Sequence, residues 1–121
     1  MSHTILVVED QEDNRRILRD LLTSKGYEII EATDGLAGVE AAKRERVDLI
    51  LMDIQLPTID GYEATRRIKA DPETADVTII AVTSYALSGD KQKALEAGCD
   101  DYVAKPYSPR ELLAMIEQYL G

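Results

Sequence analysis

Cysteine is almost absent from this chain of 121 residues, in which Cys99 is the only one. A single cysteine excludes an intrachain disulfide and a metal site built from several cysteines, and it gives no sign of an oxidising compartment. No histidine or asparagine accompanies it in a pattern typical of thiol enzymes. We therefore expect Cys99 to pack in the core and to take no part in catalysis.

Long hydrophobic runs are missing as well. The first four residues lead straight into a strand-like segment, without the basic stretch and apolar run of a signal peptide. The longest apolar runs are far shorter than the about 20 residues that a membrane-spanning helix needs. These absences favour a cytoplasmic protein without a membrane partner.

Basic residues are outnumbered, with 14 lysines and arginines against 23 aspartates and glutamates and a formal net charge of -9. Such a charge repels polyanions, so nucleic acid is a poor candidate partner. The composition, 45% hydrophobic and 31% charged, is ordinary for a globular protein. We expect residues 1–121 to form one compact domain, with no output domain attached.

Five short apolar segments bounded by turn residues predict β-strands. Those at residues 5–8, 49–52 and 78–82 are rich in valine and isoleucine and do not alternate with polar residues, which indicates buried parallel strands. Segments 27–31 and 101–104 are shorter or more mixed, as edge strands tend to be.

Apolar residues at helical spacing lie between these strands. Gly26, Asp71 and Gly98 mark helix ends, Asp60 marks a helix start, and Ser108 is the expected N-cap of the last helix. The spaced apolar residues, helix by helix, are Ile17, Leu18, Leu21 and Leu22; Leu36, Val39 and Ala42; Ala64 and Ile68; Leu87, Ala94 and Leu95; and Leu112, Leu113, Ile116 and Leu120.

The regular alternation of strand and helix predicts right-handed crossovers and a parallel sheet covered by helices on both faces. The predicted fold class is therefore α/β, a doubly wound three-layer sandwich with five helices. In such sheets ligands bind beyond the carboxyl ends of the strands, where the strand order reverses. Functional residues are to be sought directly after the strands.

Polar residues follow four of the five predicted strands in a consistent way. Glu9 and Asp10 come after the first strand, Asp53 after the third, Thr83 after the fourth and Lys105 after the fifth. Parallel strands bring them to one edge, where like charges about 4 Å apart repel by about 1 kcal/mol in water and by more when partly buried. A cation is therefore implied, and oxygen ligands without cysteine or histidine favour Mg2+ over zinc.

The remaining side chains suit phosphoryl chemistry. The Thr83 hydroxyl and the Lys105 ammonium can each contact an oxygen of a bound phosphoryl group. Asp53 is then the natural nucleophile, and its attack on phosphorus gives an acyl phosphate. Taken singly, Glu9 and Asp10 are also explained as charges at a helix N-terminus, and Asp53 and Thr83 as turn or cap residues.

These residues lie in four segments of the sequence, ILVVEDQEDNRRIL, DLILMDIQLPTIDGYE, IIAVTSYA and DDYVAKPYS. In these segments the chain resembles the receiver domains of bacterial two-component response regulators, over essentially its whole length. The resemblance is to single-domain regulators of the chemotaxis type. It implies a flavodoxin-like sandwich with strand order 2-1-3-4-5.

The resemblance also implies a metal centre and a phosphorylation site. It makes Asp53 the phosphoryl acceptor, and it makes the side chains of Glu9, Asp10 and Asp53 ligands of Mg2+, with Mn2+ as an alternative cation. The backbone carbonyl of Gln55 is the implied fourth protein ligand. We expect a phosphoacceptor regulator that catalyses only its own phosphoryl transfer and dephosphorylation, and not an enzyme with an external product.

Three further positions match the family. Thr83 and Lys105 correspond to the hydroxyl and ammonium that contact the phosphoryl group, and Tyr102 to the aromatic residue that switches with Thr83. Tyr102 is also explained as core packing. Lys105 is followed by Pro106, at the place where the family has a cis peptide bond.

Partners follow from the same resemblance. The phosphoryl donor is expected to be a sensor histidine kinase or a histidine phosphotransfer protein, and the output an unknown protein bound by a monomer or a weak phosphorylation-dependent dimer. Gln55 and Tyr85 are expected to flank the path of the water that hydrolyses the acyl phosphate. The expected output surface contains Tyr85, Leu87, Lys91, Tyr102 and Tyr107.

Three rival classes differ at identifiable positions. Hydrolases resembling haloacid dehalogenases carry a second acid two residues after the nucleophile, where this chain has Gln55. A flavin-binding module needs a phosphate-cradling loop after the first strand, where the acidic residues 9–13 repel phosphate. A degenerate receiver that only binds partners is disfavoured by the intact acceptor, metal ligands, hydroxyl and ammonium.

Overall fold

The valine- and isoleucine-rich segments pair into one sheet in the computed structural model, which describes residues 3–83 and 90–121. All neighbouring strands are parallel, and their order is β2-β1-β3-β4-β5, as the resemblance implies. Each predicted strand lies within one residue of the observed bounds. The strands are β1 (Thr4–Val8), β2 (Glu28–Ala32), β3 (Leu49–Asp53), β4 (Thr78–Thr83) and β5 (Asp101–Ala104).

A helix follows each strand. Apart from Leu87, which lies outside the described residues, every apolar residue assigned to a predicted helix falls within one of these helices. No helix in residues 3–83 and 90–121 is long and apolar enough to cross a membrane. The helices are α1 (Glu12–Thr23), α2 (Gly35–Arg44), α3 (Gly61–Ala70), α4 (Asp90–Ala97) and α5 (Pro109–Leu120).

Local sequence signals explain where several helices begin and end. Asp60 caps α3 by accepting a hydrogen bond from Glu63 N, and Ser108 caps α5 by accepting one from Glu111 N. Gly98 follows α4 with φ of +112°, a conformation that favours glycine. The predicted helix boundaries at these residues are confirmed.

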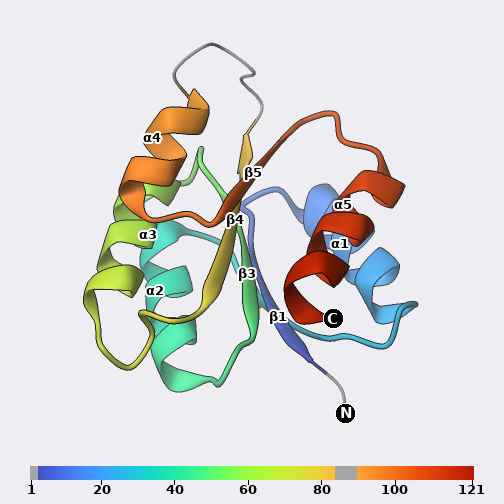
Figure 1. The fold of residues 1–121 in the computed structure, drawn as a ribbon, viewed down its shortest axis with the longest axis horizontal. Helices are drawn as coiled ribbons and strands as arrows, with labels where there is room; N and C mark the ends of the chain where they lie inside the picture. The colour runs from blue at the N-terminus through green and yellow to red at the C-terminus, as the bar shows by residue number, and fades with distance from the viewer. Residues whose placement is uncertain (1–2, 84–89) are drawn as a thin grey trace.

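The sheet is buried on both faces, as Figure 1 shows: α1 and α5 cover one face, and α2, α3 and α4 cover the other. Successive residues of each central strand pack alternately into the hydrophobic cores on the two faces of the sheet. In β1, Leu6 and Val8 pack towards α2 and α3, whereas Ile5 and Val7 pack towards α1 and α5. Burial on both sides explains why these strands show no alternation with polar residues.

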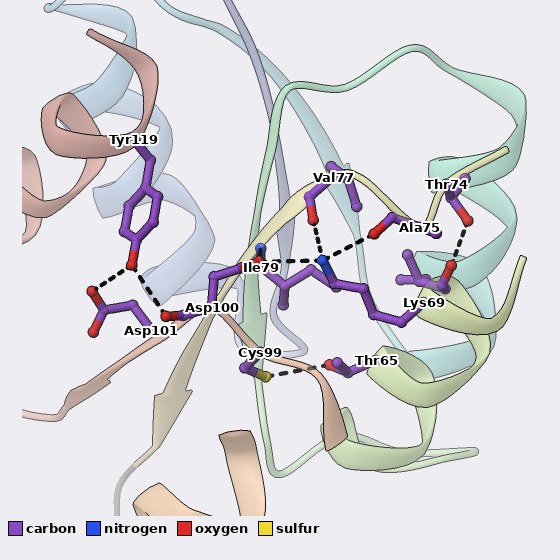
Figure 2. Close-up of polar contacts among 11 residues, drawn as sticks. Thr65, Lys69, Thr74, Ala75, Val77, Ile79, Cys99, Asp100, Asp101 and Tyr119 are labelled. Atoms are coloured by element: carbon purple, nitrogen blue, oxygen red, sulfur yellow. Dashed lines mark hydrogen bonds and ion pairs between the residues drawn. The ribbon is translucent and has the colours of Figure 1, made fainter. Parts of the chain in front are cut away.

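A polar network fixes the edge of the sheet beside the N-terminal end of β4 (Figure 2). The Lys69 ammonium, at the end of α3, donates to the carbonyls of Ala75 and Val77 and lies 3.3 Å from Asp100 Oδ2. The same Asp100 oxygen accepts a hydrogen bond of 2.8 Å from Ile79 N. One lysine therefore ties α3, the loop before β4 and the start of β5 together.

Two neighbouring contacts complete this region (Figure 2). Tyr119 of α5 donates to Asp101 Oδ2 at 2.9 Å, which links α5 to β5. Cys99 is buried with its Sγ 3.6 Å from Thr65 Oγ1, so the prediction that it packs in the core is confirmed. Burial raises the pKa of the Cys99 thiol, which keeps it protonated and unreactive at neutral pH.

Candidate functional site

Three carboxylates converge at the carboxyl ends of β1 and β3. Asp53 is the last residue of β3, and Glu9 and Asp10 directly follow β1. One carboxylate oxygen from each residue lies within 4.8 Å of the others, with Glu9 and Asp53 buried and Asp10 exposed. The predicted convergence of these three side chains is confirmed, because adjacent parallel strands end at the same edge.

Lys105 faces the two buried acids from the end of β5. Its Nζ lies 2.8 Å from Glu9 Oε1 and 3.2 Å from Asp53 Oδ2. One ammonium against three carboxylates leaves the cluster with a net negative charge at neutral pH. This imbalance is what a divalent cation would neutralise.

The surroundings shift the pKa values of these groups in different directions. Burial, with a smaller contribution from the Glu9 carboxylate, raises the pKa of Asp53 to about 6. Burial also opposes ionisation of Glu9, but hydrogen bonds from Lys105 and Gln11 N–H outweigh it and lower the pKa of Glu9. The pKa of Lys105 is raised, because its bonds to the two acids outweigh the cost of burial.

Backbone and side-chain donors hold Glu9 in place, and sequence reasoning missed them. Gln11 N donates to Glu9 Oε2 at 3.0 Å, and Asn14 Nδ2 donates to Oε1 at 3.4 Å. Arg15 donates to the Glu9 carbonyl at 2.9 Å and forms an ion pair of 3.4 Å with Glu31. The one sequence signal of this role was their position within six residues after Glu9, at the N-cap and in the first turn of α1.

A cavity of about 380 Å³ opens on the carboxylates. Gln55 lies on its wall, and Gln55 N donates to Asp53 Oδ1 at 2.9 Å. The other lining residues are Asp10, Gln11, Asn14, Asp53 and Lys105. The space adjoins the nucleophile candidate and is open to a small anionic group.

Thr83 lies in a hollow next to this cavity. It is buried at the end of β4 and lines a second hollow together with Asp10 and Gln55. The Thr83 carbonyl accepts a hydrogen bond of 2.6 Å from Lys105 N, which joins the ends of β4 and β5. The structure thus brings the predicted hydroxyl and ammonium residues to the same edge as the acids.

Tyr102 lies further down β5, opposite Ala81 of β4 in the strand register. It is partly buried and packs against the core on the side of α2, α3 and α4. The bond between Lys105 and Pro106 is cis, at the predicted place. Tyr85 and Leu87, which belong to the predicted output surface, lie outside the described residues.

The donor set fits a hard divalent cation. Three carboxylate oxygens gathered within 4.8 Å, with space for water in the cavity beside them, match the oxygen coordination that Mg2+ prefers. In the described residues the cluster contains neither a cysteine nor a histidine. The residues present therefore fit Mg2+ better than zinc.

Comparisons with known proteins agree with this geometry. The model of the response regulator receiver domain family matches residues 5–117. The polar-differentiation response regulator DivK of Brucella anthropi is 41% identical over 121 residues, which span 100% of this chain and 98% of that protein. The chain therefore belongs to the family of response regulator receiver domains, and its function is phosphorelay signalling in a two-component system.

Two solved structures are also similar. The receiver domain of the sensor histidine kinase PA1611 from Pseudomonas aeruginosa has a TM-score of 0.93 and 42% identity, with 100% of this chain and 99% of that one covered. A magnesium ion is coordinated in its active site cleft. The receiver domain of Ssk1 from Saccharomyces cerevisiae, in complex with the histidine phosphotransfer protein Ypd1, has a TM-score of 0.91 and 31% identity, with 98% of this chain and 88% of that one covered.

Proposed function

We propose that Asp53 is the residue that accepts the phosphoryl group. The observation that carries this proposal is the arrangement of Asp53 at a cavity of about 380 Å³, between an ammonium at 3.2 Å and two further carboxylates. Among the three acids, Asp53 combines burial with a raised pKa of about 6, and it lies at the centre of the sheet edge. These features suit a nucleophile that must be ionised yet not tightly neutralised.

The chemistry transfers one phosphoryl group between two bonds. An Asp53 oxygen forms a bond to phosphorus while the bond from phosphorus to the donor, an imidazole nitrogen of phosphohistidine, breaks and its electron pair returns to the imidazole. Glu9, Asp10, Asp53 and the carbonyl of Gln55 are the proposed ligands of Mg2+. Bound Mg2+, or Mn2+ in its place, supplies positive charge to the phosphoryl oxygens.

Lys105 and Thr83 are proposed to sense the new phosphoryl group. Lys105 exchanges part of its contact with the acids for a phosphoryl oxygen, and the Thr83 hydroxyl turns to a second oxygen. Tyr102 then repacks on β5 and changes the surface around it, which includes Lys91 and Tyr107. NMR of Tyr102 with and without beryllofluoride tests the switch, and identical ring shifts in the two states would contradict it.

The donor is proposed to be a sensor histidine kinase or a histidine phosphotransfer protein. The Ypd1 complex of the similar Ssk1 receiver supports the second of these. The output is proposed to pass to a separate protein, because DivK, which this chain spans over 98% of its length, is itself a regulator of receiver size. Three further properties stay predictions: that the protein forms no external product, that it acts as a monomer or weak dimer, and that it acts in the cytoplasm.

The acceptor is tested by incubating the protein with acetyl phosphate, with and without Mg2+, and measuring the intact mass. We expect one added phosphoryl mass only with Mg2+, and none in Asp53→Asn, which retains the shape of the side chain. Asp60→Asn is the matched control, because asparagine caps α3 as well as aspartate does.

Each outcome of this experiment has a distinct meaning. Labelling of Asp60→Asn at the native level together with an unlabelled Asp53→Asn supports the proposal. A labelled Asp53→Asn would place the phosphoryl group elsewhere. Failure of the native chain with acetyl phosphate and then with a histidine kinase would make the chain a receiver that only binds partners.

A further inference from the structure

A threonine in an uncommon backbone conformation lies three residues beyond Gln55. Thr58 has φ of +70°, in the left-handed region that costs an ordinary residue about 1–2 kcal/mol and a β-branched one more. Among the described residues it is the one non-glycine with positive φ. A backbone that adopts this conformation needs contacts that hold it there.

Those contacts come from the N-terminus of α2. The Thr58 hydroxyl donates to Asp34 Oδ1 at 3.2 Å and accepts from Leu36 N at 3.2 Å. Asp34, the N-cap of α2, also accepts from Ala37 N at 2.8 Å through the same oxygen. A single hydroxyl therefore joins the loop after β3 to the capped end of a helix that precedes β3 in the chain.

Close packing reinforces this junction. Gly35 N donates to the Pro57 carbonyl at 3.2 Å, and a Cβ on Gly35 would overlap the carbonyl oxygen of Ile59. The far end of the same loop is fixed as well, since Gly61 N donates to the Ile54 carbonyl at 2.9 Å. The loop is thus held against α2 in its middle and closed at its end by a hydrogen bond to Ile54, the residue after β3.

The held loop contains Gln55, whose carbonyl is the proposed fourth protein ligand of the metal. Only Leu56 and Pro57 separate Gln55 from Thr58. The ring of Pro57 fixes its own φ and restricts the backbone of Leu56, so little freedom remains between the two positions. A displacement of Thr58 therefore reaches the Gln55 backbone, which also donates to Asp53 Oδ1.

We propose that Asp34 and Thr58 are positioning residues for the metal centre: their side-chain hydrogen bond clasps the loop after β3 so that the Gln55 carbonyl is preorganised for a divalent cation. This inference rests on the proposed metal site and adds two residues that touch neither the cation nor the phosphoryl group. It assigns Thr58, in its left-handed conformation, a role in positioning the Gln55 carbonyl as well as in turning the chain.

The test is a titration of Mg2+ into protein without phosphodonor, followed by amide NMR shifts of Asp10, Asp53 and Gln55. Thr58→Val keeps the branched shape and loses the hydroxyl, so we expect its dissociation constant for Mg2+ to rise at least about threefold. Thr58→Ser keeps the hydroxyl and should bind nearly as the native chain does. Thr58→Gly relieves the backbone strain while also losing the hydroxyl, and it should bind Mg2+ weakly although it folds well.

Thr74→Val is the matched control at the opposite end of the sheet. Thr74 donates its hydroxyl to the Ile68 carbonyl at 2.6 Å, so this variant also loses a threonine hydrogen bond and stability. Its Mg2+ affinity should equal that of the native chain, which separates positioning from general destabilisation.

The possible failures are distinguishable. Native affinity in both Thr58→Val and Thr58→Gly would overturn the clasp and leave the metal site standing. Absence of Mg2+-dependent shifts in the native chain would overturn the metal site and the clasp together.

Discussion

Two partly buried lysines at opposite ends of the same sheet show how this fold separates structure from function. Lys69 Nζ contacts two backbone carbonyls and one carboxylate, which satisfies its three N–H donors. Lys105 Nζ contacts two carboxylates and opens on a cavity, beside a third acid that it does not reach within bonding distance. Saturated contacts hold the first region together, whereas unbalanced charge and open space equip the second for binding.

The largest stability effect is expected from Lys69→Met (Figure 2). The substitution leaves Asp100 and two carbonyls without their shared donor, so the free energy of unfolding should fall by about 3 kcal/mol. Urea denaturation measures it. Lys43→Met, which removes an exposed ion pair of 3.8 Å with Asp71, is the control and should change stability little. If the folded Lys69→Met chain no longer accepted a phosphoryl group, the separation of the two regions would be wrong.

At the site around Lys105, a substitution is expected to raise the free energy of unfolding and not to lower it. The folded pKa of Asp53 is raised to about 6, above the about 3.9 of an unfolded chain, so ionisation at pH 7 costs stability. Without Mg2+, Asp53→Asn should therefore raise the free energy of unfolding at pH 7 by on the order of 2 kcal/mol. The gain should shrink as the pH falls from about 6 to 4, because the native carboxyl is then already protonated. Urea melts at pH 4, 5, 6 and 7 measure this, and a gain independent of pH would contradict it.

Stabilisation by Mg2+ should depend on the site around Lys105 and not on the region around Lys69. At a free concentration about five times the dissociation constant, Mg2+ should stabilise the native chain by about 1 kcal/mol, since it binds only the folded site. Thermal melts with and without the ion should show the same increment in Lys69→Met and most of it lost in Asp10→Asn. An equal increment in Asp10→Asn would remove that residue from the metal centre.

The smallest effect is expected from Tyr119→Phe. Loss of the hydroxyl breaks its bonds to Asp101 Oδ2 and the Asp100 carbonyl, which should cost about 0.5–1 kcal/mol. Mg2+ affinity, measured by the same NMR titration, should not change. A weakened Mg2+ site in this variant would mean that the two ends of β5 are coupled.

Much of this molecule was predictable from local patterns. The strands at residues 5–8, 49–52 and 78–82 were identifiable because burial on both faces demands unbroken apolar runs. Ser108 and Asp60 were identifiable as helix starts, because capping needs a short polar side chain at one defined position. The acids and Lys105 were identifiable as one site, because parallel strands bring their ends together.

Other parts were not predictable, because they depend on contacts between distant segments. Asp100 follows a glycine turn and precedes an edge strand, which in sequence is typical of a solvated loop. In the structure it accepts from Ile79 N and pairs with Lys69. Apart from their position five and six residues after Glu9, Asn14 and Arg15 likewise carry no mark of their contacts to it. Thr58 carries no mark of its bond to Asp34.

Hydrophobic periodicity and chain direction are local properties of the sequence. They are therefore enough to predict the order of the elements, the faces that each strand buries and the set of charged side chains at one edge of the sheet. Three other properties follow from the packed fold alone: which oxygen each ammonium reaches, which acids of the site have raised pKa values and which a lowered one, and which loop is bonded to which helix. Those properties depend on distances of a few ångströms between residues far apart in the chain, and such distances are fixed only when both faces of the sheet are packed.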